Sequence, residues 1–182
     1  MQAGSEHQSS FAKLQEYEQL SLAHKFDDPS KLDRANNWAG VVFRLGDHKL
    51  ACSIADISEI LTLENYSPVP GAKPWILGLA NVRGNLVTIC DLLWSLTGIR
   101  SPLTSRTRTL IAPMQGRPVG LLVDEVYGQR HFHTDDAKKT RVFEKTELAG
   151  FVKLQYKTKD EAWGVLDMDA LLNDSKFLSG AN

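Results

Sequence analysis

The residue types that most often carry reaction chemistry are few in this sequence and do not cluster. Of the five histidines, only His131 and His133 have a spacing that would place both side chains on one face of a strand. A metal ion held there would need a third ligand, for which Asp135 and Asp136 are the candidates. Two exposed histidines at a sheet edge explain the pair without a metal, so we expect no metal site.

Paired acidic residues are also poor candidates for catalysis. Adjacent residues on a strand point to opposite faces of the sheet, so such carboxylates rarely form an acid–base pair. Turns and helix caps account for them more simply. The sequence has no nucleophile elbow, phosphate-binding loop or dinucleotide-binding glycine motif, so we expect no catalytic residues, no cofactor and no enzyme. The acidic pairs are Asp124-Glu125, Asp135-Asp136, Asp160-Glu161 and Asp167/Asp169.

Arg83 is the most informative charged residue, because it interrupts the apolar stretch Gly78–Leu92 and is followed directly by Gly84. In one interpretation these two residues form a hairpin tip, where the glycine adopts a positive φ and the arginine points into water. In the other, a rigid turn holds the arginine toward carboxylate or carbonyl groups of a partner, to which its planar fork of donors is suited. The residues alone leave both interpretations open.

The composition is that of a folded protein with little overall charge. The chain has 182 residues and a mass of 20.3 kDa; 42% of the residues are hydrophobic, 24% are charged and the formal net charge is -1. This length suits one domain, or two small lobes around a shared core. The near-neutral charge disfavours a general nucleic-acid binder and a protein that binds anionic membranes by charge alone.

The sequence also lacks targeting signals. No apolar stretch approaches the roughly 18 residues that cross a bilayer, and the first residues have neither the basic nor the apolar region of a secretory signal. We therefore expect a cytoplasmic protein without direct membrane insertion. Cys52 and Cys90 lie in apolar, strand-like runs, which predicts two buried, reduced thiols.

The chain divides into a leader, residues 1–37, and a body. In the leader, Ser10 is suited to cap a helix that runs to about Phe26 and that either packs on the body or waits for a partner. In the first part of the body, the sequence pattern predicts a strand hairpin, a short helix or turn, a buried strand, and a helix capped by Asp91. These segments are Trp38–Leu45, His48–Ser53, Ile54–Leu61, Leu86–Cys90 and Leu92–Leu96.

The second part of the body repeats this order of elements, ending in a helix preceded by Asp167. The repeated segments are Thr107–Ala112, Pro118–Val123, Gly150–Tyr156, Ala162–Leu166 and Met168–Leu172. We therefore predict a mainly β fold of two pseudo-symmetric barrels. The first subdomain would span residues 38–100 and receive the C-terminal helix, the second would span 106–167, and residues 176–182 would be a tail.

The segment that contains the arginine resembles a known family. Asn81–Gly84, followed by Leu86–Leu92, resembles the N-x-R-G…(V/I)-x-D-L core of the CheW-like adaptors, which link chemoreceptors to a histidine kinase. The resemblance covers about residues 38–175 and includes both predicted hairpins, the Ile54–Ile60 segment and the last helix. It implies two similar five-stranded β-barrels around a shared core, in agreement with the repeat.

The resemblance also implies a function without catalysis. One surface would pair with the regulatory domain of a CheA-type histidine kinase, and a groove between the lobes would take the cytoplasmic tip of a chemoreceptor at a membrane-associated array. For the apolar members of the implied site, ordinary barrel core is an equally good interpretation. The residues implied as partner contacts are Arg83, Glu59, Ile54, Ile57, Val82, Asn81 and Gly84.

Within the family, the leader and the segment Gly78–Gly84 are most similar to the PilI-type adaptors of type IV pilus (twitching) chemosensory systems. An adaptor of a flagellar or another chemosensory pathway is the first alternative. A small-barrel module that binds nucleic acid or carbohydrate is an alternative from another class. That module would need a basic sheet face bearing aromatic residues, whereas the four tryptophans are scattered along the chain. The run Tyr127–His133 departs from the family's apolar pattern.

Overall fold

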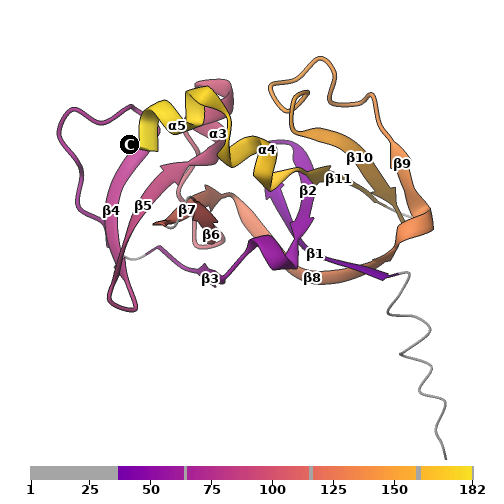
Figure 1. The fold of residues 1–182 in the computed structure, drawn as a ribbon, viewed down its shortest axis with the longest axis horizontal. Coiled ribbons are helices and arrows are strands. Elements are labelled where there is room, and N and C mark those ends of the chain that lie inside the picture. Colours follow the sequence, from indigo (N-terminus) through magenta and orange to yellow (C-terminus); the bar gives the residue numbers. More distant parts are fainter. Residues whose placement is uncertain (1–36, 64, 115–116, 159–160, 182) are drawn as a thin grey trace, which may run out of the picture. The chain divides into compact units, whose positions relative to one another are not determined.

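The computed structural model of the protein describes residues 37–63, 65–114, 117–158 and 161–181. They belong to a single structural unit that begins at Asn37. The leader helix predicted for residues 10–26 lies outside the described residues. The body is mainly β, as predicted, with two sheets and a few short helices (Figure 1).

The first sheet has six strands and is built around the predicted N-terminal hairpin. Gly46, with a φ of 58°, supplies the tight turn of that hairpin. The strands are antiparallel except where β2 and β11 run parallel. In pairing order they are β8 (Glu125–His133), β1 (Asn37–Leu45), β2 (His48–Ser53), β11 (Ala162–Leu166), β10 (Val152–Lys157) and β9 (Ala137–Lys139).

The six-stranded sheet curls into a barrel around an aromatic cluster. Phe132 on β8 stacks on Tyr156 of β10 with ring centroids 4.6 Å apart, although three strands separate β8 from β10 in the sheet. Trp38 on β1 stacks on the same tyrosine at 5.3 Å. Val42, Ala51 and Trp163 complete this interior. Val41 and Phe43 point to the opposite face of β1, so this strand is buried on both sides.

The second sheet has five strands, and its two edge strands also approach each other. The segment after β3 returns along β4, where Ser67 and Leu79 exchange backbone hydrogen bonds of 2.8 and 2.9 Å. Gly78 is required there, because a Cβ atom at this position would lie 2.2 Å from the carbonyl oxygen of Ser67. In pairing order the strands are β3 (Glu59–Leu61), β6 (Arg108–Met114), β7 (Arg117–Val123), β5 (Asn85–Asp91) and β4 (Ile76–Val82).

The outer faces of the two barrels meet in one shared core, as the resemblance implied. Phe43 and Leu50 of the six-stranded sheet belong to the same buried cluster as Leu110 and Leu121 of the five-stranded sheet. The helices α4 and α5 run across the two sheets and add apolar side chains to this cluster (Figure 1). The helices are α3 (Leu92–Thr97), α4 (Met168–Leu172) and α5 (Ser175–Ala181).

The predicted helices after Asp91 and Asp167 are confirmed. Asp91 caps α3 by accepting a hydrogen bond from the backbone N–H of Trp94, and Asp167 caps α4 through Ala170 in the same way. Gly98 ends α3 with a φ of 76°. The two helices follow corresponding strands, β5 and β11, which supports the predicted pseudo-symmetry.

Neither sheet is built from one of the predicted subdomains, because each half of the chain gives strands to both sheets. The hairpin β1–β2 of the first half pairs in parallel with β11, the last strand of the second half. In the same way, β6–β7 of the second half pairs in parallel with β5 of the first. The chain crosses between the sheets after each hairpin, through η1 (Ile54–Asp56) in one case and through Asp124 in the other.

Two local predictions differ from the structure. Only the first part of Ile54–Leu61 is helical, since Glu59–Leu61 is recruited as edge strand β3 by hydrogen bonding to β6. The predicted tail is instead mostly helix α5, and its Phe177 is buried in the shared core. The run Tyr127–His133, which departs from the family's apolar pattern, lies in β8, where a β-bulge opposite Val42/Phe43 shifts the register at its start.

Candidate functional site

The predicted hairpin tip is a two-residue turn that joins β4 to β5. Val82 pairs with Asn85, so Arg83 and Gly84 are its central residues. Both have a positive φ, 51° and 86°, which is the combination of a type I′ turn. The side-chain oxygen of Asn81 accepts a hydrogen bond of 2.8 Å from the backbone N–H of Gly84 and so holds the turn closed.

The positive φ of Gly84 agrees with the prediction, but that of Arg83 was not expected. Arg83 is the one non-glycine residue with a positive φ in the described part of the chain. A left-handed conformation costs an ordinary L-residue about 1–2 kcal/mol, and asparagine or glycine is favoured at both central positions of this turn. Arg83 therefore occupies a position whose backbone geometry does not favour it.

Arg83 is paired with Glu59, the second charged residue of the predicted site. The guanidinium Nη2 lies 2.7 Å from Oε1 of Glu59, and the side chains are 80% and 22% exposed. Glu59 is on β3 and the arginine follows β4, so the pair links the two edge strands of the five-stranded sheet. An exposed ion pair of this kind contributes at most about 1 kcal/mol to stability. Its main effect is to fix the direction of a guanidinium that remains open to solvent.

The three apolar candidates are not equivalent. Ile54, the first residue of η1, is 39% exposed. Ile57 is half-buried and packs against the shared core, and Val82 packs against the interior of the five-stranded barrel. Ile57 and Val82 are thus partly core residues, whereas Ile54 is accessible at the surface.

Two exposed apolar residues near the tip were not identified from the sequence. Leu86, which pairs with Asn81 across the hairpin, is 67% exposed, and Ile60, next to Glu59, is 40% exposed. Leu86 lies in a segment that the sequence predicts as a buried strand, and Ile60 lies in one predicted as a short helix or turn. The tip of the five-stranded sheet therefore combines a cation, a carboxylate and exposed apolar side chains.

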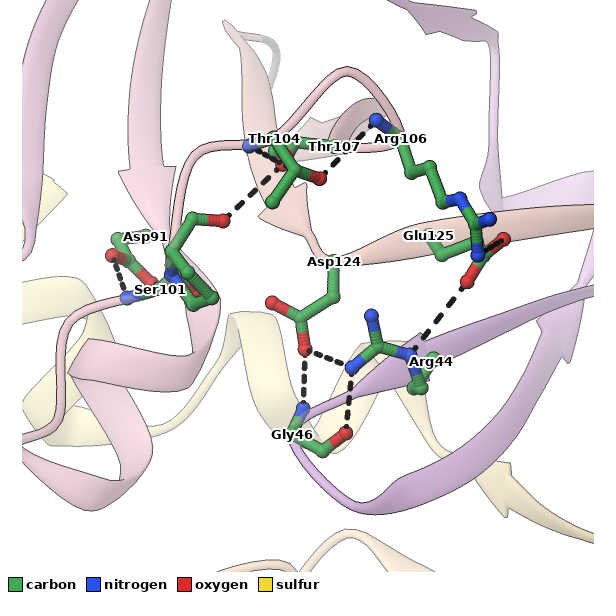
Figure 2. Close-up of polar contacts among 10 residues, drawn as sticks. Arg44, Gly46, Asp91, Ser101, Thr104, Arg106, Thr107, Asp124 and Glu125 are labelled. Carbon is green, nitrogen blue, oxygen red and sulfur yellow. Dashed lines mark hydrogen bonds and ion pairs between the residues drawn. The ribbon is translucent and has the colours of Figure 1, made fainter.

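A buried polar junction lies where the chain crosses from the five-stranded to the six-stranded sheet (Figure 2). Oδ2 of Asp124, the residue between β7 and β8, accepts hydrogen bonds from the backbone N–H of Gly46 at 2.6 Å and from Arg44 at 3.3 Å. Arg44 also faces Glu125, which pairs with Arg106 at 3.4 Å. These contacts attach the β1–β2 turn to the crossing. The sequence had assigned Asp124 only to an ordinary turn.

Asp124 is only 3% exposed, and its second carboxylate oxygen, Oδ1, has no hydrogen-bond partner. Burial raises the pKa of this carboxyl group, and the nearby carboxylates of Asp91 and Asp47 act in the same direction. The Gly46 N–H and the Arg44 guanidinium oppose the rise but do not cancel it. Burial at this junction therefore disfavours the charged form of the Asp124 carboxyl group.

The remaining candidates for chemistry are in structural settings. Cys52 and Cys90 are buried, as predicted, and burial raises the pKa of each thiol to about 12, which keeps both protonated. His131 and His133 are exposed on β8, an edge strand of the six-stranded sheet. Among the described residues, no group of three His, Cys, Asp or Glu side chains is arranged to hold a metal ion. None of the described helices is long and apolar enough to cross a membrane.

Comparison with known proteins gives the class to which this fold and site belong. The CheW-like domain family matches residues 39–176. Protein PilI of Pseudomonas aeruginosa is 31% identical over 84% of this chain and 85% of its own length. Chemotaxis protein CheW of Bacillus subtilis is 23% identical over 73% of this chain and 85% of its own length. The crystal structure of the scaffolding protein TtCheW from Thermoanaerobacter tengcongensis has a TM-score of 0.63 at 22% identity, and the match covers 71% of this chain and 88% of that chain.

The chain belongs to the CheW-like domain family. Members of this family are non-catalytic adaptors of chemosensory systems, which couple receptors to the kinase CheA. The similarity to PilI agrees with the relationship to pilus-type adaptors expected from the sequence.

Proposed function

We propose that this protein couples methyl-accepting chemoreceptors to a CheA-type histidine kinase in the pathway that controls type IV pilus twitching motility. It works as a bridge at membrane-associated receptor arrays and catalyses no reaction. The assignment to a pilus pathway is supported by the similarity to PilI over most of both chains. The partner surface is the tip of the five-stranded sheet, centred on Arg83.

The observation that carries this assignment is the conformation of Arg83. Its side chain is 80% exposed, yet the I′ turn and the 2.7 Å contact with Glu59 fix its direction. A cation that is both accessible and oriented loses little entropy when it binds, and its fork of donors suits carboxylate or carbonyl groups. The strained backbone supports a functional role, because glycine or asparagine would serve the turn alone at lower cost.

The exposed apolar residues provide a surface that a helix can cover. Ile54 lies on the segment just before Glu59, and Leu86 lies on the hairpin that carries Arg83. A helix that binds a groove presents apolar side chains to its floor and charged side chains to its rim. The receptor tip therefore contacts this apolar surface, and Arg83 with Glu59 sets the register of the bound helix.

The test is the charge reversal Arg83→Glu in the full chain. Titration with a receptor-tip fragment and with the regulatory domain of a CheA-type kinase should show weaker binding to at least one of them. Reversing the sign at a buried interface contact costs about 2–5 kcal/mol, a loss of affinity of roughly thirtyfold to several thousandfold. Arg83→Glu also removes the exposed ion pair with Glu59 and places a second carboxylate beside it, so we expect the free energy of unfolding to fall by no more than about 1–2 kcal/mol.

Arg141→Glu is the matched control, because Arg141 is also exposed and also lies beside a glutamate, Glu144. This variant should bind both partners as the wild type does. If Arg83→Glu binds both partners at full strength, the contact surface lies elsewhere. If the wild type binds a flagellar-type receptor and kinase but not the pilus-type pair, the pathway assignment is wrong and the adaptor role remains.

A further inference from the structure

A second surface feature lies at one end of the six-stranded barrel and borders η1, whose first residue, Ile54, belongs to the surface proposed to contact the receptor. It is a cavity of about 270 Å³. Its lining comes from the start of β1 and β10 and from the end of β2 and β11, so it opens at one end of this barrel. The segment η1 and the first turn of α4 contribute the rest of the lining. A volume of this size is below the roughly 300–1,000 Å³ of typical small-molecule sites.

The lining of the cavity combines apolar and acidic side chains. Trp38, Leu154, Val165 and Met168 supply apolar surface, and Leu154 is 40% exposed. Asp56, Asp167 and Asp169 supply three carboxylates. Lys153 is the one cation among the lining residues, so the lining carries a net negative charge.

The three carboxylates do not have a cationic partner within the described part of the chain. None of the described ion pairs includes Asp56, Asp167 or Asp169. Asp167 caps α4, which uses one of its oxygens. Partial burial raises the pKa of Asp56, and the charges of Asp169 and Asp167 raise it further. The three groups therefore repel one another, and a cation placed among them would relieve that repulsion.

We propose that this cavity binds an arginine or lysine side chain, flanked by apolar residues, from a segment of a partner protein. Such a side chain has an aliphatic stem that can lie on the apolar lining residues and a charged head that can meet the carboxylates. The head group then forms charge-assisted hydrogen bonds with carboxylates that otherwise lack a cationic partner. Charge complementarity is the reason for choosing a basic occupant over a purely apolar one.

This docking pocket goes beyond the proposed adaptor function. It shares no lining residue with the tip formed by Arg83 and Glu59, although two of its lining residues, Ser53 and Asp56, flank Ile54 of the proposed receptor surface. Failure of the Arg83→Glu test would not affect the pocket, and failure of the pocket would not affect the tip.

The experiment uses the full-length protein and a capped peptide in which one arginine is flanked by leucines. Binding is followed by NMR through the indole N–H signal of Trp38 and the methyl signal of Met168, both from lining residues. A second peptide carries citrulline in place of arginine, which keeps the shape and removes the charge. We expect saturable shifts of both signals, with the citrulline peptide at least tenfold weaker.

The double variant Asp56→Asn/Asp169→Asn should lower the affinity for the arginine peptide at least tenfold and leave the citrulline peptide unaffected. Neither side chain has a hydrogen bond within the described structure, and Asp167 is retained because it caps α4. Glu147→Gln, at a carboxylate that lines a different cavity, is the matched control and should bind as the wild type does.

Equal affinity of the wild type for the two peptides would overturn the proposal, because the cavity would then recognise only apolar surface. Absence of any saturable shift at millimolar peptide would also overturn it. If the double variant does not fold, the comparison of arginine with citrulline on the wild-type protein still decides the question.

Discussion

At position 83, the backbone and the side chain favour different residues. The two-residue turn demands a positive φ, which asparagine and glycine tolerate and arginine does not. The ion pair with Glu59 offsets only part of the free-energy cost of the left-handed backbone, since the arginine side chain is 80% exposed. Arginine is disfavoured at this position of the turn. Its presence is therefore better explained by a contact that its side chain makes with a partner than by a contribution to the stability of the fold.

The substitution Arg83→Asn separates these two effects. It should raise the free energy of unfolding by about 0.5–1 kcal/mol, because the relief of a left-handed arginine (about 1–2 kcal/mol) exceeds the lost surface ion pair. Binding of the receptor or kinase fragment should nevertheless fall. Urea denaturation measures the first quantity and titration the second. A variant that is less stable than the wild type by more than 1 kcal/mol would mean that Arg83 mainly holds the sheet edges together.

Asp124 shows a related conflict in the interior. Its carboxylate is buried with one oxygen unpaired, and its pKa is raised above the usual 3.8. The folded state therefore holds a proton more tightly than the unfolded state. It follows that this group's contribution to stability is fully present below pH 3.8 and is lost as the pH rises through the raised pKa.

The comparison with Asp124→Asn isolates this contribution, because other titrating groups cancel between the two proteins. The amide oxygen can still accept the hydrogen bond from Gly46, and it carries no charge at any pH. We expect the stability of the variant relative to the wild type to increase as the pH is raised from about 4 to neutral. Thermal melts across this range measure the difference. A flat or decreasing difference would show that Arg44 stabilises the charged carboxylate more than burial opposes it.

At the scale of elements, the sequence predicts the regular parts and misses those fixed by distant neighbours. The first hairpin and α4 were predicted closely because turn and capping residues act locally. Strand β3 was missed, since its three residues become a strand only by pairing with β6, about 50 residues later in the chain. Strand β8 has no apolar alternation for strand prediction to detect, because most of its side chains are exposed or only partly buried.

The predicted site shows the same division. Arg83 and Glu59 were both named as partner contacts from the family resemblance, but their ion pair with each other and the exposure of Leu86 were not predicted. An apolar residue in a strand is assigned to the core unless the neighbouring strands are known. The junction around Asp124 joins residues about 80 positions apart, and no local pattern marks it.

A substitution in the terminal helix α5 tests whether this helix is part of the core. Phe177 was assigned to a tail, but it is buried beside residues of α4 and both sheets. Phe177→Ala should lower the free energy of unfolding by about 3 kcal/mol, within the range for a phenylalanine removed from a core. Chemical denaturation measures this loss. Val142→Ala, at a side chain that is 68% exposed, should change stability by less than about 0.5 kcal/mol. Equal effects of the two substitutions would place α5 outside the cooperative unit.

At the scale of the whole molecule, the exchange of hairpins makes the body a single unit. Each sheet needs strands from both halves of the chain, and both sheets pack on one core. Neither half can complete a sheet alone. The family match also begins at residue 39, close to the first strand.

Deletion of residues 1–36 should therefore leave a body that unfolds in one cooperative transition, because every described strand is retained. The melting curve of the truncated protein, compared with that of the full chain, is the measurement. Loss of cooperativity would mean that the leader is part of the core. An unchanged transition together with altered binding to receptor fragments would identify the leader as a determinant of partner choice.

The parallel pairing of β2 with β11 has a consequence during synthesis. Leu50 pairs with Gly164, more than a hundred residues later in the chain. At the translation rate of about 5–20 residues per second, β2 leaves the ribosome roughly 5–20 seconds before its neighbour is made. Through that interval an apolar strand edge has no partner, and such edges pair readily with other chains. A nascent chain of this protein is therefore a natural client for chaperones that cover strand edges until the last strand is complete.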